Sequence, residues 1–371
     1  MLRDALNCFV KIILLSGKRN RLNHSQIELF HRLILEHNAR FSVKNIQEYV
    51  FWSDPFRRTK YDHLKKWLKF SPSLSTSTAI ATWGLGRKAV KLLLTAVIFN
   101  KPFFLFEDGF IRSLYPWVAK VDPRLNAGIS FCIDSKGFYY DGEVSTDLEG
   151  RLNTQVVSND DCLQARKIIQ KIVDNKISKY NHQPLTFNYP KEPNKKRVLV
   201  VDQSYGDMSL ICGGVDDSVF ERMVQDAVRE NPDSEIIFKV HPDTLTKKEA
   251  SGFIQFIPKE VKIIQEPVNP ITLLETVDEV YVATSQLGFE ALMCGKKVYV
   301  YGLPFYSGWG LTDDKVQCSR RKRKLTLEEM FYIVYMTYSH YVNPLTGQES
   351  TIDEAIDYIL ECRNKLFCAK Q

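Results

Sequence analysis

Short apolar runs alternate with helical segments in the second half of the sequence, and this alternation limits the fold more than any other feature. The runs are VLVVD at 198–202 and four later segments, Glu235–Val240, Lys262–Gln265, Glu279–Ala283 and Lys297–Tyr301. Helices are expected between them, near 219–230, Ile271–Thr276 and Leu287–Cys294. Alternating strands and helices form a parallel, doubly wound sheet, whose ligands bind beside the carboxyl ends of the strands. The pattern predicts an α/β fold with its site at that edge.

The first half of the sequence shows a less regular version of the same alternation. The expected elements are strands at Ala79–Trp83 and Pro102–Phe106, a helix at Arg87–Phe99, a strand pair within Gly128–Tyr140 that turns at Lys136-Gly137, and a helix over Asp160–Tyr180. The first seventy residues are predicted to be helical, and a Ser/Thr/Pro stretch at 71–78 ends them.

A length of 371 residues exceeds the usual size of one domain, so we expect two domains that share a cleft. The stretch Asn181–Lys196 contains several prolines and lysines and is the expected linker. The predicted division is an N-terminal lobe at 1–190, a C-terminal lobe at 191–325, and helices at 326–371 that cross back to the N-terminal lobe. Capping boxes predict helix starts at Ser218, Thr326 and Thr351.

Composition excludes several classes of protein. A net charge of +6 is too small to indicate nucleic-acid binding, so no nucleic-acid partner is expected. The eight cysteines are scattered without C-x-x-C pairs or zinc-ligand spacing, which predicts no metal site and no disulfide framework. The apolar run Phe9–Leu15 is too short to span a bilayer, so a cytoplasmic protein is expected.

Two basic segments each allow two interpretations. Basic residues within 11–40 are interspersed with apolar ones, which suits either an anionic membrane surface or a solvated helix at the edge of the N-terminal lobe. The run RRKRK at 320–324 is either a solvated loop or a contact for lipid phosphate or a polyanionic acceptor.

Two carboxylates follow the predicted strand at 102–106, in the sequence Glu107-Asp108-Gly109. If the strand continues, the two side chains point in opposite directions, one toward the cleft and one toward the scaffold. A carboxylate in such a place can attack an anomeric carbon or accept a proton, as sugar chemistry requires. An ordinary Asp-Gly turn is the alternative interpretation.

Polar residues also follow strands in the second half: Asp202-Gln203, His241-Pro242, and Ser285-Gln286 with Glu290 one helical turn later. A histidine there can donate to a phosphate oxygen, and the start of a helix after Ser285 favours an anion. Glu290 is a candidate for contacts with ribose hydroxyls. The alternatives are a structural histidine, an N-cap serine and a solvated helix glutamate. The aromatic loop at 302–310 is either a sugar or base platform or a hydrophobic flap.

Several of these segments together resemble a known family. They are WGLGRK (83–88), FEDGFIRS (106–113), the stretch that ends at Tyr139-Tyr140-Asp141, VLVVDQSYGD (198–207), IIFKVHPD (236–243), and TSQLGFEAL followed by GLPFYSGWGLTDD. In this order, over about residues 80–315, they are similar to the capsule polysaccharide β-Kdo transferases of the KpsC/LipA type.

The resemblance implies a GT-B-like fold in which two Rossmann-like lobes face a central cleft. It also implies a glycosyltransferase that transfers Kdo from CMP-Kdo, with retention, to a lipid-linked Kdo or saccharide acceptor during surface polysaccharide synthesis. The implied site residues are Asp108, Glu107 and His241 for catalysis, and Gln203, Ser285, Gln286 and Glu290 for the donor, with His241 and Ser285 at its phosphate. Arg112 is expected, on charge alone, to pair with the Kdo carboxylate.

The implied partners are CMP-Kdo, the lipid-linked acceptor, and the inner face of the inner membrane or a capsule assembly and export complex. CMP-Kdo is a substrate, so no cofactor is expected, and the sequence places no acidic D-x-D cluster at the cleft, so the predicted mechanism needs no metal. Two rival hypotheses are a GT-B transferase for another CMP-sugar or a UDP-sugar, and a non-catalytic scaffold. Family members often carry two such modules, whereas this chain has one, so we expect it to add a single residue.

Overall fold

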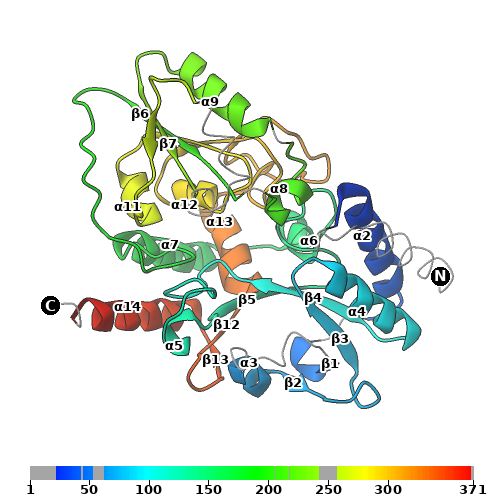
Figure 1. Cartoon of the computed structure of the whole chain (residues 1–371). Helices are drawn as coiled ribbons and strands as arrows, with labels where there is room; N and C mark the ends of the chain where they lie inside the picture. Colours follow the sequence, from blue (N-terminus) through cyan, green and yellow to red (C-terminus); the bar gives the residue numbers. More distant parts are fainter. Residues whose placement is uncertain are drawn as a thin grey trace. The chain divides into compact units, whose positions relative to one another are not determined.

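The computed structural model of the chain describes residues 22–42, 45–52, 62–204, 206–216, 218–241 and 257–368 (Figure 1). The chain divides into two compact units. The N-terminal unit comprises Met1–Tyr139, Val144–Arg151 and Val334–Gln371, and the C-terminal unit comprises Tyr140–Glu143 and Leu152–Ile333. The C-terminal segment from Val334 onward thus belongs to the N-terminal unit.

A seven-stranded sheet in the order β13-β12-β5-β4-β3-β1-β2 is the centre of the N-terminal unit (Figure 1). Its strands are β1 (Val50–Trp52), β2 (Lys69–Phe70), β3 (Ala79–Trp83), β4 (Phe103–Asp108), β5 (Ser130–Asp134), β12 (Ser339–Val342) and β13 (Glu349–Ser350). Strands β1 to β4 are parallel, and β5, β12 and β13 continue the sheet in antiparallel pairs. The helices are α2 (His24–Asn38), α3 (Asp62–Trp67), α4 (Arg87–Ile98), α5 (Pro123–Asn126), α6 (Asp147–Thr154, which begins in this unit) and α14 (Ile352–Cys368), with a 3-10 turn at Ile46–Glu48.

The core of the N-terminal unit explains why β1 forms. Phe51 is fully buried, and its ring contacts Phe104 and Phe106 edge to face at centroid distances of 5.6 Å. Aromatic pairs in this geometry add to the free energy gained by burying their surface. The segment Val50–Trp52 is therefore a strand, and the prediction that the first seventy residues are helical throughout was wrong.

One further prediction in the N-terminal unit is corrected. The strand pair expected within Gly128–Tyr140 is a single strand, β5, which pairs with β4 and β12. Asp134 ends this strand, because its carboxylate accepts the backbone N–H groups of Lys136 and Gly137 and turns the chain. The helix predicted to start at Thr326 continues as a π-helix at Tyr332–Tyr338, and strand β12 follows.

The C-terminal unit contains a six-stranded, wholly parallel sheet in the order β11-β10-β9-β6-β7-β8. Its strands are β6 (Arg197–Val201), β7 (Glu235–Lys239), β8 (Lys262–Ile264), β9 (Glu279–Val282), β10 (Lys297–Val300) and β11 (Asp313–Asp314). The helices are α7 (Asn159–Asp174), α8 (Met208–Cys212), α9 (Val219–Glu230), α11 (Pro270–Glu275), α12 (Leu287–Met293) and α13 (Leu327–Phe331). The predicted parallel sheet is confirmed.

Helix α9 covers one face of this sheet, and its buried residues Phe220, Met223 and Val224 share a core with Val198 and Phe238 (Figure 1). The predicted capping box at Ser218 is absent, because the Ser218 hydroxyl donates to Asp216 Oδ1 instead. The capping boxes at Thr326 and Thr351 are present.

Helix α7, which the sequence groups with the N-terminal lobe, belongs to the C-terminal unit. It packs against α13, and Arg166 of α7 donates to Glu328 of α13 at 2.8 Å. In the part of the chain described here, no helix combines the length and hydrophobicity needed to cross a membrane. The predicted apolar run at Phe9–Leu15 lies outside the described residues.

Candidate functional site

Strand β4 continues through both predicted carboxylates. Glu107 is paired in the sheet with Cys132 and Asp108 with Phe131, so both backbones are fixed by β5. A side chain at Gly109 would collide with Ser130, and the Gly109 N–H donates to the Ser130 carbonyl at 2.9 Å. The glycine therefore allows β5 to approach closely, and Asp108 lies at a rigid strand end and not in a loose turn.

The Asp108 carboxylate is paired with Arg112. Arg112 Nε donates to Asp108 Oδ2 at 2.9 Å, while Asp108 Oδ1 accepts no hydrogen bond from any residue that the structure describes. The Asp108 side chain is 14% exposed and that of Arg112 only 2%. The predicted pairing of Arg112 with a donor carboxylate stays a prediction, since the structure pairs this guanidinium with Asp108.

Sequence reasoning did not identify His63, which lies near the same strand end. Its ring nitrogen Nε2 is 2.8 Å from the carbonyl of Gly128, and a side chain at Gly128 would lie 3.8 Å from Asp108 Oδ1. Burial lowers the pKa of His63, and the positive charge of Arg112 lowers it further. Because α3 lies far from β4 in the sequence, no local motif connects His63 with Asp108.

The remaining predicted residues lie in the C-terminal unit, after three strands that are neighbours in its sheet. Gln203 follows β6, His241 follows β7 and Ser285 follows β9, and the sheet order is β9-β6-β7. Because the sheet is parallel, these three residues lie along its carboxyl edge. This is the edge at which the sequence predicted a site.

Gln203 connects two of these strand ends. Its Oε1 accepts the Thr284 N–H at 2.8 Å, and its Nε2 donates to Thr284 Oγ1 at 3.0 Å and Ser209 Oγ at 3.3 Å. Thr284 and Ser209 were not identified from the sequence, although Thr284 directly precedes a predicted site residue. The Gln203 amide therefore fixes the turn before α12, and its predicted contact with a donor stays a prediction.

The backbone of His241 is held by the neighbouring strand end. Its N–H donates to Asp202 Oδ2 at 3.0 Å, and the Asp202 N–H donates to the Lys239 carbonyl at 3.0 Å. The His241 side chain is half-buried, and Pro242 lies outside the described residues. Asp202 thus sets the direction in which the chain leaves β7.

The aromatic loop supports the turn at Ser285. The Tyr306 hydroxyl donates to the Ser285 carbonyl at 2.5 Å, and a side chain at Gly288 would collide with Tyr306. Ser285 Oγ accepts the Leu287 N–H at 3.3 Å, although the N-cap of α12 is the next residue, Gln286. Phe305, Tyr306 and Trp309 are all buried, so this loop packs as a hydrophobic flap and does not present its rings as a platform.

Glu290 is buried and was predicted to face the donor. It accepts hydrogen bonds from Ser178 Oγ at 2.7 Å and Gln286 Nε2 at 3.2 Å, and it is 3% exposed. Burial raises the pKa of Glu290 to about 7. The hydrogen bonds from Ser178 and Gln286 lower this pKa, but they offset the effect of burial only in part. Glu290 therefore ties α12 to the turn after α7, and a contact between Glu290 or Gln286 and ribose stays a prediction.

The raised pKa of Glu290 predicts a pH-dependent stability. Between about pH 4.5 and 7 the folded protein holds a proton that the unfolded chain has released, so the free energy of unfolding falls as pH rises through this window. Glu290→Gln keeps the side-chain shape without the charge and should remove about 1 to 3 kcal/mol of this fall. Chemical denaturation at pH 5 and pH 8 measures the difference. If the free energy of unfolding changes by the same amount between pH 5 and pH 8 in both proteins, Glu290 does not titrate in this range.

The basic run at 320–324 is not a uniformly solvated loop. Its arginines bind within the C-terminal unit: Arg320 to the Gly142 carbonyl, Arg321 to the Ser307 carbonyl, and Arg323 to Glu329. Lys322 and Lys324 are exposed. The three arginines therefore hold the aromatic loop and neighbouring segments in place, whereas the two lysines are exposed.

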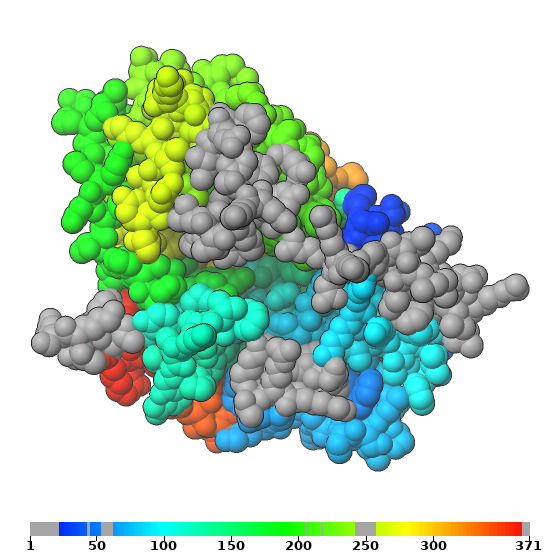
Figure 2. All heavy atoms as spheres, in the orientation of Figure 1, coloured from blue at the N-terminus to red at the C-terminus, as the bar shows by residue number. Residues whose placement is uncertain are grey.

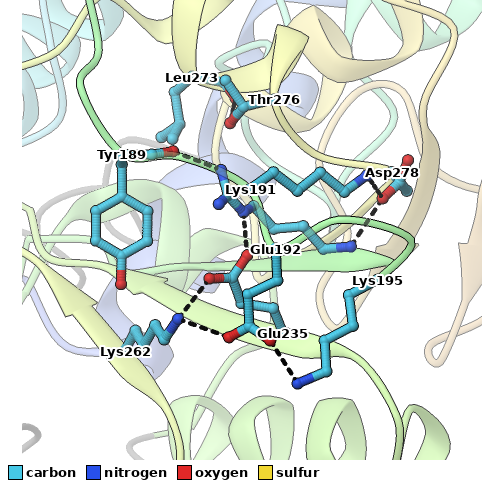
Figure 3. Close-up of polar contacts among 10 residues, drawn as sticks. Tyr189, Lys191, Glu192, Lys195, Glu235, Lys262, Leu273, Thr276 and Asp278 are labelled. Carbon is cyan, nitrogen blue, oxygen red and sulfur yellow. Dashed lines mark hydrogen bonds and ion pairs between the residues drawn. The ribbon is translucent and has the colours of Figure 1, made fainter.

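A groove of about 580 Å³ lies at the amino ends of the strands in the C-terminal sheet, opposite the carboxyl edge that carries the predicted site. Lys191–Lys196 and Asp278 line this groove. The segment that lines it is the green band at the left edge of the view in Figure 2. An ion-pair network occupies this edge. Lys262 pairs with Glu235 at 2.7 Å and Lys191 with Asp278 at 2.6 Å (Figure 3). Arg197 also pairs with Glu235, at 2.5 Å. The charges of this network neutralise one another at the amino ends of the strands, so the groove is not part of the predicted site.

The predicted site residues therefore form two groups. Glu107, Asp108 and Arg112 belong to the N-terminal unit, and His241 and the donor-binding candidates belong to the C-terminal unit. Within the described ranges, no three His, Cys, Asp or Glu side chains are grouped as a metal site would require.

Comparisons with known proteins identify relatives of this chain. A family model described as capsule polysaccharide biosynthesis protein matches residues 186–343. The β-Kdo 2,4 transferase of Thermosulfurimonas dismutans KpsC is 34% identical, with a TM-score of 0.75, and the match covers 85% of this chain and 98% of that chain. LipA, the capsule polysaccharide modification protein of Neisseria meningitidis serogroup B, is 39% identical over 299 residues, or 77% of this chain.

The lipopolysaccharide-processing protein LpsZ of Rhizobium meliloti is 35% identical over 302 residues, which are 78% of this chain and 66% of LpsZ. The match to LipA spans 42% of that protein, so this chain corresponds to less than half of its length. The structural match confirms the expected α/β, GT-B-like fold with two parallel-rich sheets. This chain belongs to the capsule polysaccharide biosynthesis family that includes KpsC and LipA.

Proposed function

We propose that this chain is a glycosyltransferase that transfers Kdo from CMP-Kdo to a lipid-linked Kdo or saccharide acceptor in capsule polysaccharide synthesis. Its similarity to the KpsC β-Kdo transferase supports the proposal. The observation that carries it is Asp108, whose carboxylate lies at a strand end, with one oxygen held by Arg112 and the other without a partner among the described residues. A buried carboxylate oxygen without a partner is costly, and such groups occur where the chemistry needs them.

The proposed mechanism has two displacement steps and retains the anomeric configuration. First, an oxygen of Asp108 forms a bond to the anomeric carbon of Kdo while the bond from that carbon to the CMP phosphate oxygen breaks, and the electron pair leaves with CMP. Second, an acceptor hydroxyl attacks the same carbon, and the ester bond to Asp108 breaks and restores the carboxylate. The hydroxyl proton passes to water in this step, because β4 continues through both carboxylates and the Glu107 side chain therefore points away from that of Asp108. A catalytic role of Glu107 stays a prediction.

The residues of the C-terminal unit are proposed to bind the donor. The Ser285 hydroxyl and the ring of His241 would donate to the phosphate of CMP, and Gln203, Gln286 and Glu290 would line the donor site. A monophosphate leaving group carries less charge than a diphosphate, so we propose a reaction that needs no divalent metal. We also propose that the reaction takes place at the cytoplasmic face of the inner membrane, where a lipid-linked acceptor is accessible.

Product analysis tests this function. Purified protein is incubated with a synthetic Kdo-primed glycolipid in three parallel reactions. Each reaction contains one donor: CMP-Kdo, CMP-sialic acid or a UDP-sugar. We expect one added Kdo with CMP-Kdo, a β linkage by NMR, and the same rate in the presence of EDTA. Transfer from a different donor would change the assigned substrate, and transfer from none of them, with a folded protein, would favour the scaffold hypothesis.

A further inference from the structure

The guanidinium of Arg112 is enclosed by the N-terminal unit and is fixed on more than one side. Its Nε donates to Asp108 Oδ2 at 2.9 Å, and its Nη1 donates to Ser113 Oγ at 2.9 Å and to the Asn126 carbonyl at 2.7 Å. With 2% of the side chain exposed, almost no surface remains for a sugar carboxylate to contact. Arg112 therefore faces the protein and Asp108.

We infer that Arg112 is a positioning residue for Asp108 and not a ligand of the donor, an inference that rests on the proposed function. A guanidinium is planar, and its donors have fixed directions. Since Ser113 and Asn126 hold one nitrogen of Arg112, the direction of Nε is set, and Nε in turn sets the orientation of the Asp108 carboxylate. The second oxygen of Asp108 then keeps one direction relative to β4.

The same pair leaves one carboxylate oxygen without a donor. Arg112 Nε donates to Asp108 Oδ2, whereas Oδ1 accepts no hydrogen bond from the residues that the structure describes. Arg112 thus fixes the carboxylate through one oxygen only. A carboxylate that is oriented and not fully hydrogen-bonded suits nucleophilic attack.

The donors of the Asn126 loop give this arrangement its rigidity. Asn126 Nδ2 donates to the Ala119 carbonyl at 3.0 Å, and the Tyr115 N–H donates to the Leu125 carbonyl at 2.9 Å. The loop that follows the FEDGFIRS motif is therefore closed on itself, and its Asn126 carbonyl is a fixed acceptor for Arg112. Residues 113–126 thus support Asp108 from a distance, through Arg112.

Two substitutions separate charge from geometry. Arg112→Lys keeps the charge but cannot reproduce the three directed hydrogen bonds, and Arg112→Gln loses the charge as well. We expect Arg112→Lys to lower kcat by about 100-fold and Arg112→Gln to lower it further, because a small misplacement of a reacting group has an effect of that size. The dissociation constant for CMP-Kdo, measured by calorimetry, should change by less than about threefold. Arg222→Gln, at an exposed arginine, is the matched control.

Donor binding in the Asp108→Asn background distinguishes the two roles of Arg112. If Arg112 acts through Asp108, adding Arg112→Gln to Asp108→Asn leaves CMP-Kdo binding unchanged. A loss of tenfold or more in that background would make Arg112 a donor ligand and overturn the inference. Wild-type kcat in Arg112→Gln would overturn it as well.

Chemical rescue provides a readout that a purely structural role would not move. Arg112→Ala leaves a space beside Asp108, and added guanidinium should raise its kcat at least tenfold, with no such gain for wild type or Arg222→Gln. Thermal unfolding identifies variants that fail to fold. If Arg112→Gln or Arg112→Ala fails to fold, the kcat of Arg112→Lys decides whether Arg112 positions Asp108. Failure of the proposed function looks different: Asp108→Asn itself would retain transfer, whatever the Arg112 variants do.

Discussion

Replacing Asp108 by Asn is expected to lower the rate of Kdo transfer by on the order of 10⁴-fold, with little change in CMP-Kdo binding. The effect is large because the proposed covalent step has no other route once the attacking carboxylate is lost. An asparagine can still accept the Arg112 Nε hydrogen bond, so the fold of the strand end should persist. Single-turnover transfer assays with CMP-Kdo and a Kdo-primed glycolipid measure the loss.

Two controls make this result decisive. An asparagine directly before Gly109 is prone to deamidation back to aspartate, so Asp108→Ala is assayed beside it and intact mass is checked before and after each reaction. Asp233→Asn makes the same chemical change at an exposed position and should keep wild-type activity. Transfer by Asp108→Ala at more than a few per cent of the wild-type rate would exclude Asp108 as the nucleophile.

Replacing Glu235 by Gln is expected to destabilise the C-terminal unit by about 3 to 5 kcal/mol, the effect seen when one partner of a buried ion pair is removed. The side chains of Arg197 and Glu235 are 0% and 2% exposed, and the Arg197 guanidinium lies 5.2 Å from the centre of the Tyr189 ring. Without Glu235 the Arg197 charge stays buried beside a ring and a single carbonyl, that of Tyr189. Urea denaturation followed by circular dichroism measures the change.

The matched control is Glu361→Gln. Glu361 pairs with Lys365 on α14, where both side chains are more than half exposed, so its loss should change stability by less than about 0.5 kcal/mol. The double variant Arg197→Met and Glu235→Leu should recover part of the stability lost by Glu235→Gln, because it removes the unpaired buried charge. A Glu235→Gln protein as stable as wild type would show that the pair adds nothing to the fold.

The parallel sheet of the C-terminal unit could be predicted because its strands carry their own signal. Strand β6 is buried along its whole length, and its part Val198–Val201 appears in the sequence as an uninterrupted apolar run. The polar residues that follow these runs could be placed at one edge for the same reason. What a polar side chain binds could not be predicted in this way.

Contacts between distant residues explain most of what the sequence could not predict. Glu290 has the appearance of a solvated helix residue until Ser178, 112 positions earlier in the sequence, is brought beside it. Arg112 has the appearance of a free cation for the same reason, since the Asn126 carbonyl that holds it lies on a separate turn of the loop. The hydrogen bonds of the three arginines at 320–324 likewise depend on partners that no local pattern encodes.

The position of β5 between β4 and β12 has a consequence for synthesis on the ribosome. Ser339 of β12 is translated 207 residues after its neighbour Cys132 of β5, whereas all strands of the C-terminal unit have been made by Asp314. The C-terminal sheet can thus be completed co-translationally while the N-terminal sheet still has an open edge. A nascent chain that stalls before residue 339 therefore presents β5 to other chains or to chaperones.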